Sequence, residues 1–535
     1  MSDRREYDYV IIGGGSAGCV VANRLSADPG NSVLLLDAGR HDRHLYSRIP
    51  AGQMAAYPRE DMNWLYPAEP DPSRNDRADI WPAGKIIGGG SAINGMMYVR
   101  GHRSDYDHWA ELGNTGWSYA DVLPHFRSIE RSETGDRKTR GNHGELNVER
   151  VPIDSPLNDA FIKAAGETGI EYNPDLNGEL QEGAGPCQVS QKRGWRHSTA
   201  NAFLKPALTR ANLKVELNAS VERISIEDGA ARTVEYTSHN VDKQVCARKG
   251  VILSAGAIAS PKLLMLSGVG HPQELANHGI KTVRALPGVG KNLQEHPVVG
   301  MTFHVKNART LTSDLKNPLR ALQHGLDFVL HGRGALATPI AHAHALVRTR
   351  TGLNAPNAQI IFAPLSYEIT DKGPRPYTKP AVDMGVGLCR VQSTGTIALR
   401  SGRASDKPVI NYAVLDCEDD VKQLCEAMRL TRKIFQAPAL AHYFLDERTP
   451  GADIDSDADL EAFIRANAGL MFHPCGTCKM GSDDSAVVDA RLRVRGVERL
   501  WVADASIFPT LPAGNINATC IMVGEKAASM ILEDT

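Results

Sequence analysis

The feature that most constrains the fold of this 535-residue chain is a glycine-rich segment near its start. An apolar run, YVII at 9–12, leads into GGGSAG at 13–18, then into a helical pattern and a second apolar run that ends at Asp37. The first, third and sixth residues of GGGSAG have the spacing G-x-G-x-x-G. A strand that enters such a loop and is followed by a helix and a second strand predicts a βαβ unit of a parallel sheet.

The three glycines of this loop have separate expected roles. Gly13 permits the tight turn out of the strand, Gly15 lets the backbone approach a pyrophosphate, and Gly18 lets the helix pack close to the strand. The amino end of the helix offers free N–H groups to phosphates. Asp37 can accept hydrogen bonds from ribose hydroxyls, which disfavours a 2′-phosphate and therefore NADP. The segment predicts a bound dinucleotide, either FAD or NAD.

Composition narrows the class of protein. The chain is 42% hydrophobic and 23% charged with a net charge of −2, which is typical of a soluble globular protein, and its length predicts at least two domains. It has neither the long basic run that suits nucleic acid nor the roughly 20 apolar residues that a membrane span needs. The start of the chain lacks the pattern of a signal peptide. Nine cysteines without a repeated spacing indicate a reducing compartment, so we expect a cytoplasmic protein.

A second glycine cluster, GKIIGGGSAINGMMYVRG at 84–101, favours FAD. Consecutive glycines cost backbone entropy and are typical of backbone that lies against a flat or anionic group. A long flexible loop is the alternative interpretation.

Four segments together make the chain resemble the glucose–methanol–choline (GMC) family of FAD-dependent alcohol oxidoreductases, in particular its bacterial choline-dehydrogenase-like branch. They are the two glycine clusters, VILSAGAIASPKLLMLSGVG at 251–270, and the C-terminal run from HPCGTCKMG at 473 through LWVADASIFPTLPAGNINATCIMVGEKAASMI. The resemblance implies an α/β fold with a Rossmann-like FAD-binding domain at 1–155, 198–296 and 470–535. A substrate domain of 156–197 and 297–469 would place its sheet and helices over the flavin. It also implies that FAD contacts these residues: Gly13, Gly15, Ser16, Gly18, Asp37 and Ala38; Gly90, Ser91, Asn94 and Gly95; Val221, Ala255 and Gly256; Asp504, Ala505, Asn515 and Ile516.

The segment HPCGTCKMG is implied to carry the catalytic histidine, His473. Its implied partner is Asn515, with Asn517 as the alternative if the register slips by two residues. A neutral histidine can take the proton of an alcohol as general base, and an amide can hold the oxygen without competing for that proton. The flavin would accept the hydride at N5.

Cys475 and Cys478 in the same segment raise two other possibilities, half a zinc site or a redox disulfide. A structural zinc site needs further ligands, and the chain contains no second C-x-x-C and no H-x-x-x-H motif. The glycines around the two thiols predict a loop and not the helix start of a thioredoxin-like motif. We therefore expect bystander cysteines and no metal.

The substrate is predicted from the segment ALATPIAHAHALVRT at 335–349, which contains no carboxylate. The choline branch is implied to carry a glutamate near His342, whereas a histidine does not attract a quaternary ammonium. His342 and His344 are therefore candidate substrate residues, although a structural role is also open to both. We expect oxidation of an uncharged primary alcohol, such as an aromatic, furan-type or glycol-ether alcohol, to the aldehyde.

Several alternatives stay open from the sequence. They are a choline dehydrogenase, an FAD-containing hydroxynitrile lyase, and a flavin-binding protein without catalysis. Either oxygen or a quinone would reoxidise the flavin. Because Ile93 occupies the position of the histidine that tethers FAD in some relatives, we expect FAD to be bound non-covalently.

Overall fold

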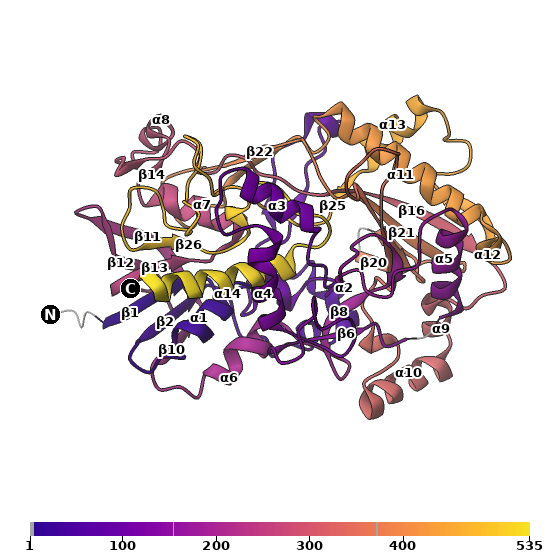
Figure 1. Ribbon diagram of the computed structural model, residues 1–535, viewed down its shortest axis with the longest axis horizontal. Helices are drawn as coiled ribbons and strands as arrows, with labels where there is room; N and C mark the ends of the chain where they lie inside the picture. The colour runs from indigo at the N-terminus through magenta and orange to yellow at the C-terminus, as the bar shows by residue number, and fades with distance from the viewer. Residues whose placement is uncertain (1–4, 154, 371–372, 535) are drawn as a thin grey trace.

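The protein is described by a computed structural model that covers residues 5–153, 155–370 and 373–534. Two large sheets lie in the two halves of an elongated molecule (Figure 1). The first sheet lies near both chain termini, and the second lies at the other end, beneath helices (Figure 1). The fold is mixed α/β, as expected from the sequence.

The first sheet has a parallel core with an antiparallel extension. Strands β10, β2, β1 and β13 run parallel to one another, and β26 is parallel to β13. Strands β12 and β11 extend the sheet, and each is antiparallel to the strand before it. The order is β10 (Leu213–Leu217), β2 (Val33–Asp37), β1 (Arg5–Ile12), β13 (Val241–Leu253), β12 (Ala230–Ser238) and β11 (Ala219–Glu227), with β26 (Leu500–Val502) paired to β13. The predicted strand–loop–helix–strand unit is therefore confirmed, and its apolar strands are buried because they form the centre of this sheet.

Two helices from opposite ends of the sequence pack together beside this sheet. α1 (Gly18–Leu25) follows the first glycine loop, and α14 (Asn517–Asp534) ends the described chain. A Cβ placed on Gly524 of α14 would lie only 2.7 Å from the backbone oxygen of Ala17, so the two segments approach as closely as glycine allows. The C-terminal segment thus completes the domain that the N-terminal segment begins.

The second sheet is antiparallel throughout. Helices α5 (Pro156–Glu167) and α11 (Glu418–Gln436) pack against it through stacked aromatic pairs. Phe161 stacks on Phe362 with ring centroids 4.9 Å apart, and Phe435 stacks on Phe303 at 3.8 Å. Its strands in order are β24 (Phe444–Thr449), β16 (Pro297–Val305), β21 (Ala381–Leu388), β18 (Ala358–Ala363), β17 (Ala343–Val347) and β7 (Gly183–Pro186), with β25 (Gly469–Leu470) paired to β16.

The two sheets draw their strands from different parts of the chain. All strands of the first sheet lie within 1–155, 198–296 and 470–535, and β25 of the second sheet lies at the 469/470 boundary. A smaller sheet joins the two sets, because β6 (Leu146–Arg150) pairs with β8 (Gln188–Lys192). The proposed domain boundaries stay a prediction. No helix within the described residues is long and apolar enough to cross a membrane.

Candidate active site

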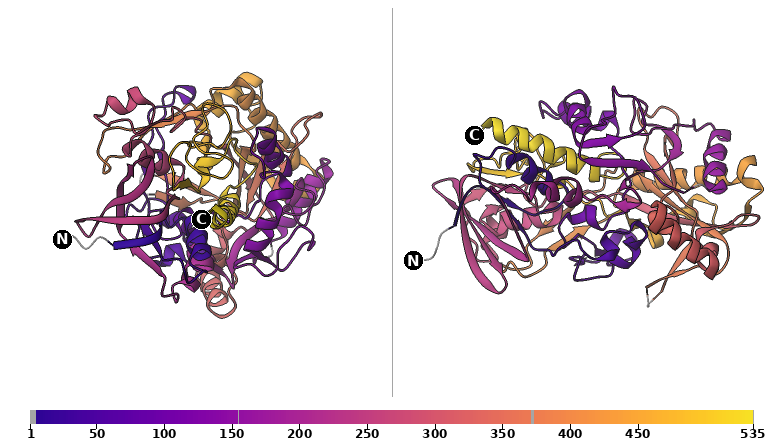
Figure 2. Two further views of the ribbon diagram at one scale, coloured as in Figure 1. Left: turned by 60° about the vertical axis from the view of Figure 1, so that its left-hand side comes forward. Right: turned by 90° about the horizontal axis from the view of Figure 1, so that it is seen from below.

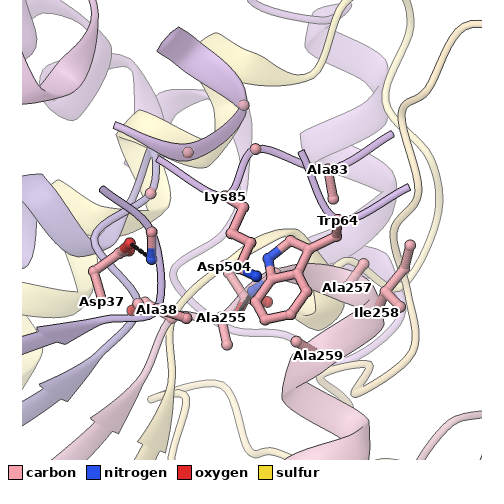
Figure 3. A pocket seen from close by; sticks show the side chains of 18 of the residues that line it. Asp37, Ala38, Trp64, Ala83, Lys85, Ala255, Ala257, Ile258, Ala259 and Asp504 are labelled. Atoms are coloured by element: carbon pink, nitrogen blue, oxygen red, sulfur yellow. Dashed lines mark hydrogen bonds between the residues drawn. The ribbon is translucent and has the colours of Figure 1, made fainter. Parts of the chain in front are cut away.

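A cavity of about 270 Å³ lies where the parallel strands of the first sheet end (Figure 3). This is the edge at which open α/β sheets bind their ligands. The indole of Trp64 and the side chain of Lys85 face the cavity, and neither was singled out from the sequence (Figure 3). The predicted cofactor residues that line it are Gly13, Gly15, Ser16, Asp37, Ala38, Gly90, Val221, Ala255, Gly256, Asp504 and Ala505.

The glycines around this cavity differ in what surrounds them. Gly13 has a φ of +99°, and a Cβ there would overlap the backbone of Ser254, while a Cβ on Gly18 would overlap the carbonyl of Gly13. A Cβ on Gly15 would have no neighbour closer than 4.0 Å, and one on Gly90 would have none within 4 Å. Gly13 and Gly18 are thus required by the packing of the protein itself. Gly15 and Gly90 leave open space that a bound group can fill, as a dinucleotide requires.

Two aspartates hold the loops at the ends of the strands. Asp37 accepts hydrogen bonds from the backbone N–H groups of Gly14 and Gly39, both at 2.7 Å. Asp504 accepts from the N–H of Gly256 at 2.8 Å and from Ser260 Oγ at 2.6 Å. Burial raises the pKa of both carboxyl groups, and these donors oppose that rise. Each carboxylate therefore fixes the shape of the cavity as well as facing into it.

The side chains of the second glycine cluster are held by residues outside the cavity. Ser91 Oγ donates to Gly88 O at 2.6 Å and lies 2.9 Å from Thr199 Oγ1. Asn94 Oδ1 accepts from the buried guanidinium of Arg196 at 2.8 Å. The predicted cofactor residues that do not line the cavity are Gly18, Ser91, Asn94, Gly95, Asn515 and Ile516.

Two segments place the predicted catalytic pair side by side. His473 follows β25, and Asn515 lies in the loop before α14. Asn515 Nδ2 lies 3.3 Å from His473 Nε2. Phe472 and Pro474, the neighbours of His473, line the dinucleotide cavity. The pair therefore adjoins the site where a bound dinucleotide would lie.

Glu295 and His296, neither of which was predicted as a site residue from the sequence, complete this cluster. His296 Nδ1 lies 3.0 Å from His473 Nδ1. The Glu295 carboxylate accepts the backbone N–H of His473 at 2.6 Å and that of His296 at 2.9 Å. A glutamate and a histidine immediately before an apolar strand, in QEHPVVG at 294–300, are the signal that could have found them.

The hydrogen bonds assign the tautomers of both histidines. His296 Nε2 lies 3.2 Å from the carbonyl oxygen of Cys389, which can only accept, so Nε2 carries the proton. In a neutral ring, His296 Nδ1 is then an acceptor, and His473 Nδ1 must donate to it. His473 Nε2 is left with its lone pair free to accept, from Asn515 in this structure. The arrangement points the basic nitrogen of His473 at Asn515 and away from His296.

Burial sets the charge state of the cluster. Burial, with the neighbouring His296, holds the pKa of His473 well below its ordinary value. Burial lowers the pKa of His296 to about 4 and raises the pKa of Glu295 to about 8, although backbone N–H donors oppose the rise at Glu295. Both imidazoles are therefore neutral at pH 7, which is the state a general base needs.

The two histidines predicted for the substrate have different surroundings. His344, on β17, accepts from Gln359 Nε2 at 3.2 Å, and the same amide lies 3.4 Å from Asn515 Oδ1. Gln359 was not predicted, and it links His344 to the catalytic pair. His342 Nδ1 lies 3.4 Å from Asn158 Nδ2, and its buried Nε2 has no partner among the described residues. Burial lowers the pKa of His342 to about 3 and that of His344 to about 4.

Backbone conformation, not sulfur chemistry, shapes the C-x-x-C segment. Cys475 and Cys478 are free, fully buried thiols whose pKa burial raises well above the ordinary value. The N–H of Cys475 donates to Gln294 O at 3.0 Å, which ties this segment to the one that carries Glu295. Phe472, just before His473, has a φ of +61°, a conformation that costs a non-glycine residue about 1 kcal/mol. The described residues hold no cluster suited to a metal ion.

A cavity at the ends of parallel strands that suits a dinucleotide, beside a neutral histidine and an amide, defines a dinucleotide-dependent oxidoreductase. Residues 7–298 and 391–524 match the N-terminal and C-terminal parts of the GMC oxidoreductase family. The chain belongs to this family and is an FAD-dependent enzyme that oxidises CH–OH groups. The open faces of Gly15 and Gly90 and the placement of Asp37 and Val221 fit FAD.

Similar proteins cover almost the whole chain. Mitochondrial choline dehydrogenase of Mus musculus is 41% identical over 98% of this chain and 89% of the relative. Oxygen-dependent choline dehydrogenase of Brucella anthropi is 42% identical over 99% of this chain and 96% of the relative. The crystal structure of pyridoxine 4-oxidase from Mesorbium loti is 31% identical, with a TM-score of 0.88 and 98% of each chain covered.

Proposed function

We propose that the protein oxidises an uncharged primary alcohol to the aldehyde, with His473 Nε2 as the base that takes the hydroxyl proton. Bound FAD supplies the acceptor for the hydride that leaves the carbon. The observation that carries the proposal is the orientation of His473, whose Nδ1 donates to His296 and whose Nε2 keeps its lone pair. The base is therefore set in the tautomer that the reaction needs before substrate binds.

Asn515 has a second role in the proton step. Its Nδ2 is held 3.3 Å from His473 Nε2, and its Oδ1 lies 3.4 Å from Gln359 Nε2. When a hydroxyl enters between the two side chains, the amide can donate to the oxygen while the imidazole accepts the proton. Gln359 Nε2 also donates to His344, so His344 helps to hold Gln359 and, through it, the amide of Asn515.

The preference for an uncharged alcohol rests on the charges around this cluster. A quaternary ammonium is held by aromatic faces and a carboxylate. The segment 335–349 contains no acid, and His342 and His344 are neutral because burial lowers the pKa of each. Glu295 already accepts two backbone N–H groups and has a raised pKa, so it is a poor partner for a cation. The likeness to pyridoxine 4-oxidase, named for an aromatic alcohol, supports the same choice.

Choline is the second candidate, and sequence similarity favours it. The choline dehydrogenases above are 41–42% identical, more than the 31% of pyridoxine 4-oxidase. The test is to measure kcat/KM for choline and to compare it with kcat/KM for benzyl alcohol, furfuryl alcohol and a glycol ether. We expect an uncharged alcohol to be preferred by at least about tenfold, the worth of one unmatched charge or hydrogen bond. A tenfold preference for choline would overturn the proposal.

A pair of variants at His342 makes this test sharper. His342→Glu restores the carboxylate of the choline branch, and His342→Gln is the matched control of similar size without charge. Turnover of choline relative to benzyl alcohol should rise in His342→Glu and stay unchanged in His342→Gln. FAD content and melting temperature of both variants check that they fold. Equal ratios in the two variants would show that the charge at this position does not select the substrate.

The mode of FAD attachment is a separate part of the proposal. Ile93 is buried in an apolar cluster with Ala56, Met62, Ile86 and Ala92, so no nucleophile stands at the tethering position. We therefore infer non-covalent FAD, which acid precipitation should release entirely into the supernatant. Yellow colour in the pellet would contradict this.

The electron acceptor and the location of the protein complete the proposal. Oxygen or a quinone reoxidises the flavin, and parallel assays with oxygen and with an artificial dye separate the two. The nine free thiols support a cytoplasmic protein. Cell fractionation of the native host tests this, and an extracellular location would contradict it.

A further inference from the structure

Helix α10 (Pro318–His331) is amphipathic, but its apolar side faces the solvent. The helix lies at the edge of the molecule, at the end away from the chain termini (Figures 1 and 2). Phe328 is its only buried residue. The exposed apolar side chains, with their exposed fractions, are Leu319 at 79%, Leu322 at 60%, Leu326 at 51%, Val329 at 78% and Leu330 at 68%.

These five side chains form one stripe. Their spacing of three, four, three and one residues places them within an arc of about 100° on a helix of 3.6 residues per turn. Phe328, which packs inward, lies on the opposite side of the helix. Single exposed leucines are ordinary on protein surfaces, whereas a contiguous apolar stripe marks an interaction surface.

The charge around the stripe is positive. Residues 306–333 contain five Lys or Arg and two Asp, an excess of three positive charges. The two acids are already paired, Asp314 with Arg309 at 3.0 Å and with Arg320 at 3.2 Å, and Asp327 with His331 at 3.7 Å. The three excess positive charges of this segment therefore have no acidic partner within it.

A cluster of basic side chains lies at the carboxyl end of the helix. β8 ends at Lys192 and is followed by a turn that carries Arg193, and a Cβ on Gly194 in this turn would lie 2.6 Å from the Cα of Gly332. The turn therefore packs directly on the end of α10, beside Arg333. Lys192, Arg193 and Arg333 are exposed, and none forms a salt bridge with a residue that the structure describes.

An aromatic residue packs against the inner side of α10, opposite to the stripe. The ring of Trp195 lies 4.7 Å from that of Phe328, and the guanidinium of Arg48 lies 5.2 Å above the indole. Trp195 is still 36% exposed. The inner side of α10 is therefore held against the protein, which leaves the stripe facing the solvent.

We propose that α10 docks the protein on the surface of an anionic lipid bilayer. The apolar stripe would enter the boundary between headgroups and acyl chains, and the cluster of Lys192, Arg193 and Arg333 would contact anionic headgroups. The helix would lie in the plane of the surface, because 14 residues span only about 21 Å and the polar flank must stay in water.

A second copy of the chain is a poorer occupant of this face. A helix about 21 Å long and about 10 Å wide offers roughly 400 Å² from two copies together, whereas stable interfaces bury about 1,200 Å² or more. Two copies would also bring two basic segments together, which is unfavourable. Anionic lipid matches both the small apolar area and the charge. This proposal does not depend on which alcohol the enzyme oxidises.

The test is co-sedimentation of the holoenzyme with vesicles of phosphatidylcholine containing about 30% phosphatidylglycerol, compared with pure phosphatidylcholine. The wild type should sediment with the anionic vesicles, and salt should weaken binding because the Debye length shortens from about 10 Å at 0.1 M to about 3 Å at 1 M. A triple variant, Leu322→Gln, Leu326→Gln and Val329→Gln, should bind at least tenfold more weakly. The variant Lys192→Gln, Arg193→Gln and Arg333→Gln should lose the preference for anionic lipid.

A matched control removes the same side chains elsewhere. Leu180, Leu445 and Val241 are 72%, 54% and 56% exposed and lie outside α10, and changing all three to Gln should leave vesicle binding unchanged. Flavin content and activity in solution should match wild type in every variant. Failure of the wild type to sediment with anionic vesicles, or equal loss in the control, would overturn the proposal. So would a wild-type dimer in analytical ultracentrifugation that the Leu322 triple variant converts to a monomer.

Discussion

The dinucleotide cavity and the catalytic cluster are built in different ways. The cavity is lined largely by backbone and small side chains at the ends of parallel strands, and its first unit lies within residues 9–37. The catalytic cluster is made of side chains from segments near 295, 344, 359, 473 and 515. Recognition by backbone needs glycines at a fixed spacing, whereas acid–base chemistry needs particular side chains held by neighbours that are distant in sequence.

The largest expected effect is at the catalytic base, where a substitution should remove catalysis and leave cofactor binding intact. His473→Ala should keep FAD and lose alcohol oxidation by about 100- to 10,000-fold, the usual worth of a positioned general base. Asn515→Ala should lose less, because the amide positions the oxygen and does not take the proton. Steady-state turnover and the visible spectrum of both variants check this. Activity of His473→Ala within about threefold of wild type would place the base elsewhere.

The reverse is expected at Gly15, where a substitution should weaken FAD binding and leave the fold intact. A valine there meets no protein atom near its Cβ position and instead fills the cavity. Gly15→Val should therefore fold while its affinity for FAD falls at least about tenfold, as expected when a side chain blocks backbone approach to a phosphate. Isothermal titration of the apoprotein with FAD measures this. The control is Gly300→Val, at an exposed strand position that also has open space around it, and unchanged FAD affinity in Gly15→Val would contradict the prediction.

The role of His296 can be tested by comparing two substitutions. His296→Leu removes the acceptor for His473 Nδ1–H and should lower kcat about tenfold, the worth of one buried hydrogen bond. His296→Gln offers an amide oxygen in its place and should recover most of the loss. The pH profile of kcat should change in the leucine variant, because the neighbour that helps lower the pKa of His473 is gone. Equal activity and identical pH profiles in both variants would mean that His296 does not position the base.

Glu295 should make stability depend on pH. Burial raises its pKa to about 8 from an ordinary 4.5, so between these values the folded protein holds a proton that the unfolded chain releases. The free energy of unfolding should therefore fall as pH rises from about 5 to 8. In Glu295→Gln this fall should be smaller, by roughly 1–3 °C in melting temperature. Parallel melting curves of the two proteins across this range would contradict the assignment.

The smallest effect is expected at the two thiols near the base. Cys475→Ser together with Cys478→Ser should change kcat less than about twofold. Within the described residues neither sulfur forms a hydrogen bond with His473, and both cysteines are held through their backbone. Some loss of stability is expected, since two hydroxyl groups become buried. A large fall in activity at unchanged FAD content would give the thiols a role in catalysis.

Much of the first region could be predicted because its signals are local. The roles of Gly13, Gly15 and Gly18 follow from their spacing alone, and the structure gives each glycine the surroundings that its role requires. His473 and Asn515 were placed by resemblance to the family, and they lie together. Most of the strand pairing of the second sheet could not be derived, because four of its six described pairs join segments far apart in sequence.

The missed residues have a common physical cause. Glu295, His296 and Gln359 act through contacts with chain segments roughly 150–180 residues away, so nothing in their local sequence states a partner. The stripe on α10 was missed for a related reason. Its periodicity is that of any amphipathic helix, and only the structure tells which side faces inward.

The packing of α14 on α1 also has a consequence for how the enzyme is made. Ser16 in the first glycine loop donates to Asn517 at 2.7 Å, and Gly524 packs against Ala17. The first βαβ unit leaves the ribosome long before α14, the helix that packs against it. Because domains fold as units once their parts are present, the cofactor cavity is completed only after α14 has been synthesised. FAD binding should therefore wait for α14, and a chain cut before this helix should fail to enclose the cofactor.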